Sequence, residues 1–278
     1  MIKTAIQLKA KIRNLSNGDN DTARAMLRIF FMERFLERLS ESDYRDSFVL
    51  KGGMLTASLI GINLRATMDI DATIIALPVN EAEISKVVEE ICRVQIDDGV
   101  SFEINKISEI MDDFEYPGLR INLTGYLDKL RQPFKIDIST DDAITPRAIE
   151  YGYSLMFEDR NILLNSYNVE TLLAEKTQTI VSRGLANTRM RDFYDVYEIT
   201  NHQDYSKELF FKAFQATCRK RSCSWSTDEI QKELDIIKAD SDMEKRWDEF
   251  CRKNYYVERA DWNEVLNAVD RVLIKSEA

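Results

Sequence analysis

The chain has 278 residues, of which 44% are hydrophobic and 31% charged, and its formal net charge is −10. This size and composition are typical of a globular protein with one large or two modest domains. No uncharged apolar run is long enough for a transmembrane helix, and the N-terminus MIKTAIQLKAKIRNL is too charged for a secretory signal. The acidic balance argues against a surface that coats DNA, although it is compatible with a local basic groove.

Four cysteines without CxxC spacing and a single histidine restrict the metal chemistry that this chain can perform. We expect the cysteines to be free thiols in a reducing cytoplasm, and we expect neither a zinc site nor a His-rich metal site.

Two helices are predicted at the start of the chain. Residues 3–16 and 21–40 have helical spacing of apolar residues, and Asn20 or Asp21 can cap the second helix. The apolar face of the second helix is expected to contain Met26, Ile29, Phe30, Glu33 and Phe35.

The stretch from Phe48 to Ile75, FVLKGGMLTASLIGINLRATMDIDATII, predicts a strand, a glycine turn at Gly52 and Gly53, a short helix and a second strand. Asp69 and Asp71 share one face of that second strand, because side chains alternate across a strand. Two neighbouring carboxylates repel each other unless a cation lies between them, and Mg²⁺ is the most plausible such cation. The alternative is an ordinary strand with a solvated acidic face.

After a predicted helix over residues 80–96, three strands are predicted around residues 102–107, 119–124 and 134–138. The apolar residues of the third strand should face the core, so Lys135 and Asp137 project to the opposite side. If this strand lies beside the one with Asp69 and Asp71, three carboxylates converge, which is typical of a two-metal phosphoryl-transfer site. A solvated strand face is the alternative here too.

From about Asn165 the pattern becomes helical, so we predict two domains, residues 1–165 and 166–278, without a flexible linker between them. A helix from about Asn168 to Arg183 places Lys176 within its apolar stripe. This lysine either extends its ammonium to solvent or points into a cleft, where it needs an anionic partner. In the next predicted helix, TRMRDFYDVYEI, Asp192 and Asp195 are neighbours on one side.

Four segments of this chain together resemble the AbiEii-type nucleotidyltransferase toxins, which include the MenT toxins and belong to the polymerase-beta-like nucleotidyltransferase superfamily. The segments are ERFLERLSESDYRDSFVLKGGMLTASL, RATMDID, KIDI and YNVETLLAEKTQTIVSRGLANTRMRDFYDVYEI, in the family's order. The resemblance implies an α+β fold: a nucleotidyltransferase core with a small mixed β-sheet flanked by helices, and a C-terminal α-helical domain that completes the active-site cleft.

The resemblance also implies a Mg²⁺-dependent enzyme, with Mn²⁺ as an alternative ion, that transfers a nucleoside monophosphate from an NTP to an acceptor. Asp69, Asp71 and Asp137 would be the metal-binding and catalytic acids, and Asp137 would activate the acceptor hydroxyl. Lys176 would bind phosphate or stabilise the leaving pyrophosphate, and an acid of the RDFYD motif, Asp195 in preference to Asp192, would complete the site. The nucleotide-binding positions implied are Lys51, Gly52, Gly53, Arg65, Thr67, Lys176 and Asp192.

Two positions leave alternatives open. The superfamily turn is commonly Gly-Ser, whereas this chain has Gly-Gly, so only backbone N–H groups could hold a phosphate there. The Thr67 hydroxyl could contact phosphate, be a target of phosphorylation or be purely structural.

By the same resemblance we expect a cytoplasmic toxin of a toxin–antitoxin or abortive-infection pair, monomeric and without membrane association. Its partners would be an NTP, an RNA acceptor such as tRNA and a cognate AbiEi-like antitoxin. The alternatives are a nucleotidyltransferase that modifies a protein hydroxyl or a small molecule, and a non-catalytic nucleotide-binding protein.

Overall fold

A computed structural model describes residues 1–61, 67–78, 80–110, 118–254, 256–257 and 260–274. Its contacts divide the chain into two compact units. The sheet unit consists of Met1–Ser58, Ala66–Asp141 and Ile149–Ser166, and the helical unit consists of Leu59–Arg65, Asp142–Ala148 and Tyr167–Ala278. None of the helices in the described part of the chain is long and apolar enough to cross a membrane.

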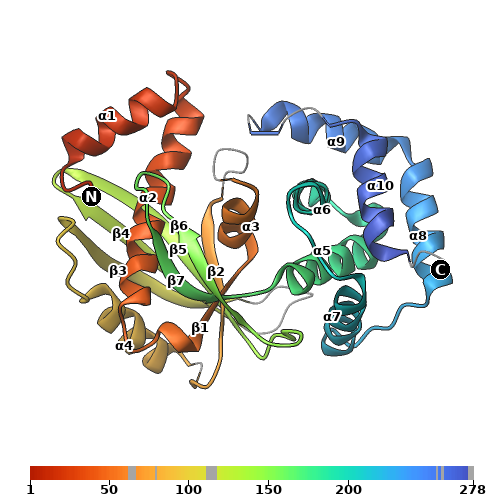
Figure 1. Ribbon diagram of the computed structural model, residues 1–278, viewed down its shortest axis with the longest axis horizontal. Coiled ribbons are helices and arrows are strands. Elements are labelled where there is room, and N and C mark those ends of the chain that lie inside the picture. Colours follow the sequence, from red (N-terminus) through yellow and green to blue (C-terminus); the bar gives the residue numbers. More distant parts are fainter. Residues whose placement is uncertain (62–66, 79, 111–117, 255, 258–259, 275–278) are drawn as a thin grey trace. The chain divides into compact units, whose positions relative to one another are not determined.

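The sheet unit is built on a mixed sheet of seven strands in the order β3-β4-β5-β2-β1-β7-β6 (Figure 1). β2 and β5 are parallel neighbours, and β1 is antiparallel to β2 and parallel to β7. The elements up to Ser166 are α1 (Ala5–Leu15), α2 (Asn20–Ser40), β1 (Phe48–Lys51), α3 (Gly52–Ile60), β2 (Asp69–Ile74), α4 (Glu81–Cys92), β3 (Val100–Ile110), β4 (Gly118–Leu127), β5 (Leu130–Thr140), β6 (Ile149–Ser154) and β7 (Asn161–Ser166).

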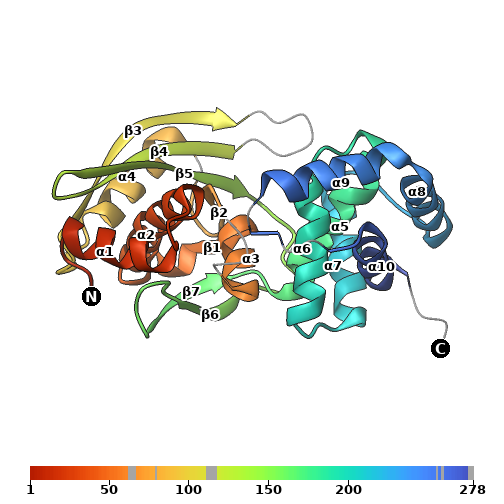
Figure 2. The ribbon, with the colours of Figure 1, turned by 90° about the horizontal axis from the view of Figure 1, so that it is seen from above.

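One face of the sheet is apolar and the other carries the acids. Figure 2 shows α2 and α4 along the same side of strands β3 to β5. Phe35 and Leu36 of α2 line a small internal space together with Ile70, Ala72 and Ile136 of the sheet. The alternating residues of β2 and β5 therefore point to the opposite face.

The edge hairpin of β6 and β7 was not predicted from the sequence. Tyr153 is fully buried, but several of its neighbours in β6 are exposed. Such an edge strand lacks the regular alternation that identifies a strand in a sequence.

Helix α2 buries more than the predicted apolar face, because its charged residues are buried as well. The Arg34 guanidinium lies 2.9 Å from a Glu37 carboxylate oxygen and 3.2 Å from Glu158. Arg38 donates two hydrogen bonds to the buried Asp98 carboxylate, at 2.8 and 2.9 Å. Paired and hydrogen-bonded charges of this kind can be buried without leaving an isolated ion in the core.

Glu33 differs from these charges, because its carboxyl accepts hydrogen bonds from the Met156 N–H and the Tyr153 hydroxyl, at 3.0 and 3.5 Å. Burial raises the pKa of Glu33 to about 8 from 4.5. The folded protein thus holds this proton more tightly than the unfolded chain does. The stability that depends on this proton is complete below pH 4.5 and is lost as the pH rises through 8.

We therefore predict that Glu33→Gln removes most of this loss of stability at high pH. The glutamine amide oxygen can still accept a hydrogen bond from the Met156 N–H, but the side chain carries no charge. The free energy of unfolding of the wild type should fall by on the order of a few kcal/mol between pH 5 and pH 9. Urea unfolding of both proteins at the two pH values measures the difference. Equal pH dependence in the two proteins would show that Glu33 ionises freely in the fold.

The helical unit consists mainly of six helices in the described chain, and α5 packs against both α6 and α7 (Figure 1). α5 begins where the Asn168 side chain accepts a hydrogen bond from the Thr171 N–H at 2.8 Å, and it ends at Gly184, whose φ is +46°. Its helices are α5 (Val169–Arg183), α6 (Met190–His202), α7 (Lys207–Lys220), α8 (Thr227–Ala239), α9 (Ser241–Lys253) and α10 (Trp262–Leu273).

Candidate active site

The predicted site residues that the structure describes form two groups, one in each unit. In the sheet unit, β2 and β5 are aligned so that Asp71 lies opposite Asp137 and Asp69 lies opposite Lys135. Partners in this register point to the same face of the sheet. The prediction that the strand with Asp137 lies beside the strand with Asp69 and Asp71 is confirmed.

Burial and mutual repulsion make Asp71 and Asp69 weaker acids than usual. Burial raises the pKa of Asp71 to about 6, and the Asp137 and Asp69 carboxylates add to this rise. The Gly53 N–H, which donates to Asp71 Oδ2 at 3.0 Å, and the Lys51 ammonium oppose it. The pKa of Asp69 is also raised, first by burial and then by Asp137. A cation bound between these carboxylates would relieve the repulsion.

Asp137 is held by a cation from the neighbouring strand. Arg120 of β4 donates from Nε to Asp137 Oδ1 at 2.8 Å and from Nη2 to Oδ2 at 2.6 Å. Arg120 was not predicted as a site residue from the sequence. The sequence places Arg120 on the polar side of its strand, which is the signal that could have identified it. Only the register between β4 and β5 shows that Arg120 lies opposite Asp137.

Among the side chains that the structure describes, no three acidic, histidine or cysteine groups are already grouped as a metal site. Two contacts are consistent with this finding: Asp137 is paired with Arg120, and Asp71 accepts from Gly53. The donors nevertheless fit Mg²⁺, which prefers carboxylate oxygens. Asp69 and Asp71 could hold such an ion directly, and Asp137 could join them by exchanging its bond to Arg120.

The two glycines are fitted closely around Asp71. No separate turn precedes α3, because the helix begins at Gly52 itself, whose φ is +56°. A Cβ at Gly52 would lie 2.2 Å from Asp71 Oδ2, well inside contact distance. Gly53 donates its N–H to the same carboxylate. The glycines therefore position Asp71, and a role for Gly53 in holding a phosphate remains a prediction.

We predict that Gly52→Ala inactivates the protein, since the new methyl group must displace the Asp71 carboxylate. The positive φ alone should lower the free energy of unfolding by about 1–2 kcal/mol. Gly18→Ala is a matched control, because Gly18 has φ +85° and no atom within 4 Å of a new Cβ. Chemical unfolding should show this destabilisation in Gly18→Ala and a larger one in Gly52→Ala, whereas the transfer activity that the resemblance implies should be lost only in Gly52→Ala. Normal transfer by Gly52→Ala would contradict this assignment.

The other predicted nucleotide-binding residues of this region differ in their surroundings. Lys51 ends β1 directly opposite Asp71 and is half-buried. Thr67 is buried, and its hydroxyl donates to the Asp69 carbonyl oxygen at 3.2 Å. Arg65 lies outside the described residues.

The second group lies in the helical unit and is centred on Lys176 of α5. This side chain is only 8% exposed, and its Nζ lies 2.5 Å from Asp195 Oδ2 and 3.5 Å from Asp192 Oδ1. Asp195 is fully buried, whereas Asp192, at the start of α6, keeps 16% of its side chain exposed. Lys176 therefore does not extend its ammonium to solvent, and its anionic partners are the two acids of α6.

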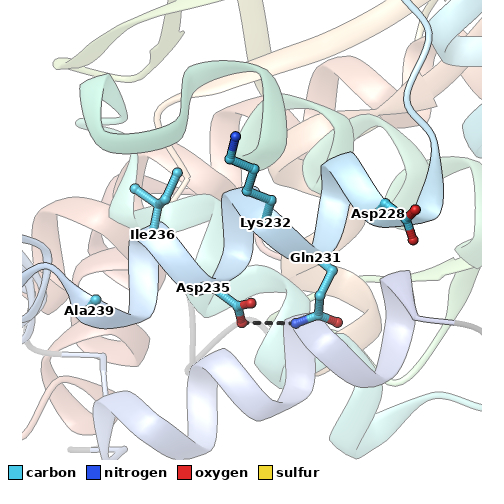
Figure 3. A pocket seen from close by; sticks show the side chains of 6 residues that line it. All are labelled: Asp228, Gln231, Lys232, Asp235, Ile236 and Ala239. Atoms are coloured by element: carbon cyan, nitrogen blue, oxygen red, sulfur yellow. Dashed lines mark hydrogen bonds between the residues drawn. The ribbon is translucent and has the colours of Figure 1, made fainter.

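A hollow of roughly 490 Å³ on α8 contains none of the predicted site residues (Figure 3). Its walls come from one helix, and two of its polar side chains, Gln231 and Asp235, bind each other at 2.9 Å. Among the described residues, only α8 contributes side chains to its lining, so we do not assign a catalytic role to this hollow. Its lining residues are Asp228, Gln231, Lys232, Asp235, Ile236 and Ala239.

Comparison with solved structures identifies the same fold in other proteins. MenT4, a nucleotidyltransferase toxin from Mycobacterium tuberculosis, is 16% identical, with a TM-score of 0.54 over 95% of this chain and 98% of that one. JHP933 from Helicobacter pylori is 15% identical, with a TM-score of 0.53 over 90% of both chains. A putative nucleotidyltransferase from H. pylori is 16% identical, with a TM-score of 0.53 over 90% of this chain and 92% of that one. At these identities the likeness shows the fold alone.

A search of curated proteins finds no match to this chain. The family comparison is more informative, because the profile described as "Nucleotidyl transferase AbiEii toxin, Type IV TA system" matches residues 34–270. The match includes both groups of predicted site residues. The chain therefore belongs to the AbiEii family of nucleotidyltransferase toxins of type IV toxin–antitoxin systems.

Proposed function

We propose that this toxin transfers a nucleoside monophosphate from an NTP to a hydroxyl of an RNA, with tRNA as the acceptor and Mg²⁺ as the metal. The modification would block translation and arrest growth in the cytoplasm until an AbiEi-like antitoxin counteracts it. The observation that carries the proposal is the alignment of Asp71 and Asp137 on adjacent strands, with Asp69 two residues away on the same face.

We further propose a role for each group of residues. Asp69 and Asp71 would hold Mg²⁺, which would supply charge neutralisation at the triphosphate. Asp137 would accept the proton of the attacking hydroxyl, and Lys51, Gly53 and Thr67 would lie along the nucleotide.

Lys176 would bind a phosphate, with Asp195 as the acid that orients it and Asp192 as the more exposed partner. Arg65 is proposed as a further nucleotide contact on the resemblance alone.

The reaction would be driven by positioning and electrostatics. The acceptor oxygen would form a bond to the α-phosphorus while the bond to the bridging oxygen of the β-phosphate breaks. Pyrophosphate would leave, and the hydroxyl proton would pass to Asp137 and then to water. With both of its oxygens bonded to Arg120, the Asp137 carboxylate is held in one orientation on the sheet surface until substrate binds.

The direct test is incubation of the protein with each labelled NTP, Mg²⁺ and total RNA, followed by separation of the labelled products. We expect label in the tRNA fraction, and we expect none with Asp69→Ala or Lys176→Ala. Label in protein but never in RNA would overturn the acceptor assignment. NTP consumption in none of the mixtures would overturn the catalytic assignment and favour a binding protein.

A further inference from the structure

A hollow of roughly 480 Å³ opens in the sheet unit directly beside Asp69. It is formed by the start of β2, by neighbouring parts of β3, β4 and β5, and by one side chain of α2. Its polar lining consists of Arg28, Asp69, Asn105, Asn122, Thr124 and Lys135. Unlike the hollow on α8, it is enclosed by several elements and includes a proposed metal ligand.

The strand order places the glycines on one side of the two acids of β2 and most of this hollow on the other side. Gly52 and Gly53 follow β1, which neighbours β2 on one side, whereas β5, β4 and β3 follow on the other side. In phosphoryl transfer the attacking and leaving oxygens lie roughly in line, on opposite sides of the phosphorus. If the triphosphate extends toward the glycines, the attacking hydroxyl must arrive from the side of the hollow.

Among its described lining residues, the hollow carries more positive than negative charge, because Arg28 and Lys135 share it with a single carboxylate, Asp69. In the described chain, Lys135 makes no ion pair or hydrogen bond, and Arg28 donates only to the weakly accepting sulfur of Met68. Lys135 lies opposite Asp69 in the strand register, and its charge and that of Arg28 act on the Asp69 carboxyl. On a protein with a net charge of −10, a hollow with two cations and one carboxylate favours an anionic occupant.

The hollow has neutral hydrogen-bonding groups as well. Asn122 of β4 contributes an amide to the lining, and the Thr124 hydroxyl donates to the Asn105 amide oxygen at 2.9 Å, so the amino group of Asn105 is not used in this bond. Amides and hydroxyls bind sugar hydroxyls and base edges, and basic side chains bind phosphate. This combination matches one nucleotide of a nucleic acid better than it matches an apolar or acidic side chain.

We propose that this hollow is the acceptor subsite, which holds the reacting nucleotide of the RNA while Arg28 and Lys135 bind its phosphodiester. The proposal rests on the nucleotidyltransferase function proposed above. The hydroxyl of the nucleotide held here would attack the α-phosphorus, its proton would pass to Asp137, and pyrophosphate would leave on the side of the glycines. Arg28, Asn122 and Lys135 are then substrate-binding residues that determine acceptor specificity.

The test compares Arg28→Gln and Lys135→Gln with the wild type in two measurements. The first is the affinity for a fluorescent NTP analogue with Mg²⁺, and the second is the KM for a deacylated tRNA mixture at several salt concentrations. We expect a KM for RNA that rises about tenfold in each variant, with a much smaller change in the affinity for the NTP. The slope of log affinity against log salt should decrease by about 0.7 for each RNA phosphate that the variant can no longer bind.

Lys86→Gln on α4 is the matched control, because it removes the same charge from an exposed position outside the hollow. Lys135→Arg should retain RNA binding and separates the effect of charge from misfolding. An unchanged KM and salt slope in both glutamine variants would overturn the subsite, as would an equal loss of NTP affinity. Failure of the wild type to label RNA would instead refute the proposed function, before any variant is compared.

Discussion

Replacing Asp71 by asparagine is expected to abolish nucleotide transfer and, at the same time, to stabilise the metal-free fold at neutral pH. If Asp71 binds the metal as proposed, its loss removes several kcal/mol of transition-state stabilisation, so kcat should fall by about 10³-fold or more. The amide oxygen of asparagine can still accept from the Gly53 N–H, so the local structure should persist. Steady-state transfer assays with saturating NTP measure the loss.

The stability gain follows from the pKa of Asp71, which burial raises to about 6 from 3.8. The folded protein holds this proton more tightly than the unfolded chain does. The stability that depends on the Asp71 proton is therefore complete below pH 3.8 and is lost as the pH rises through 6. Asparagine avoids this loss of stability. At pH 8, in the presence of a chelator, the free energy of unfolding of Asp71→Asn should therefore be roughly 2 kcal/mol higher than that of the wild type. An Asp71→Asn protein that is inactive but less stable than the wild type would identify Asp71 as a structural carboxylate.

Two controls separate these effects. Asp159→Asn changes an exposed carboxylate of the same unit and should alter neither activity nor stability. Millimolar Mg²⁺ should stabilise the wild type more than Asp71→Asn, because a ligand stabilises only the fold that binds it. Equal stabilisation of both proteins by Mg²⁺ would mean that the ion binds elsewhere.

Replacing Lys176 by methionine is expected to have the largest effect on stability. The change removes the ammonium that lies 2.5 Å from the fully buried Asp195 carboxylate. Breaking a buried ion pair by removal of one partner destabilises a fold by about 3–5 kcal/mol. Chemical unfolding should show this loss, and the melting temperature should fall accordingly. A decrease below about 1 kcal/mol would be typical of a solvent-exposed pair and would contradict the buried arrangement.

The double variant Lys176→Met/Asp195→Asn distinguishes structure from catalysis. Removing both charges of the pair should recover most of the stability, because no buried carboxylate loses its cation. If Lys176 binds phosphate as proposed, the stable double variant remains inactive. Recovery of transfer activity with stability would show that the lysine only supports the fold. Asp192→Asn, which alters the more distant partner at 3.5 Å, should have a much smaller effect on stability.

Local patterns were sufficient to predict most of the elements around the site. The helix predicted over residues 21–40 is observed at Asn20–Ser40, and the predicted strand with both acids is observed at Asp69–Ile74. Period-two alternation also placed Lys135 and Asp137 on one face of their strand, and β5 has that pattern of burial. These features depend on residues that are close in the sequence, so the sequence contains their signal.

The pairings between distant segments were decided by the tertiary structure. Asp137 binds Arg120 because β4 and β5 align in one particular register, and a shift of one residue would place Arg120 on the other face. Lys176 meets Asp195 because α5 packs against α6. The hairpin of β6 and β7 joins the sheet edge through the parallel pairing of β7 with β1, which no local pattern specifies.

The amino-acid sequence by itself therefore determined which residues are candidates for the site: the acids on one strand face, the two glycines after the first strand and a lysine within an apolar stripe. Only the three-dimensional packing decided which cation neutralises which acid, why Gly52 must lack a side chain, and that a basic hollow lies beside Asp69. The physical reason is that periodicity records burial along a single element, whereas ion pairs and hollows form between elements whose relative register depends on the whole fold.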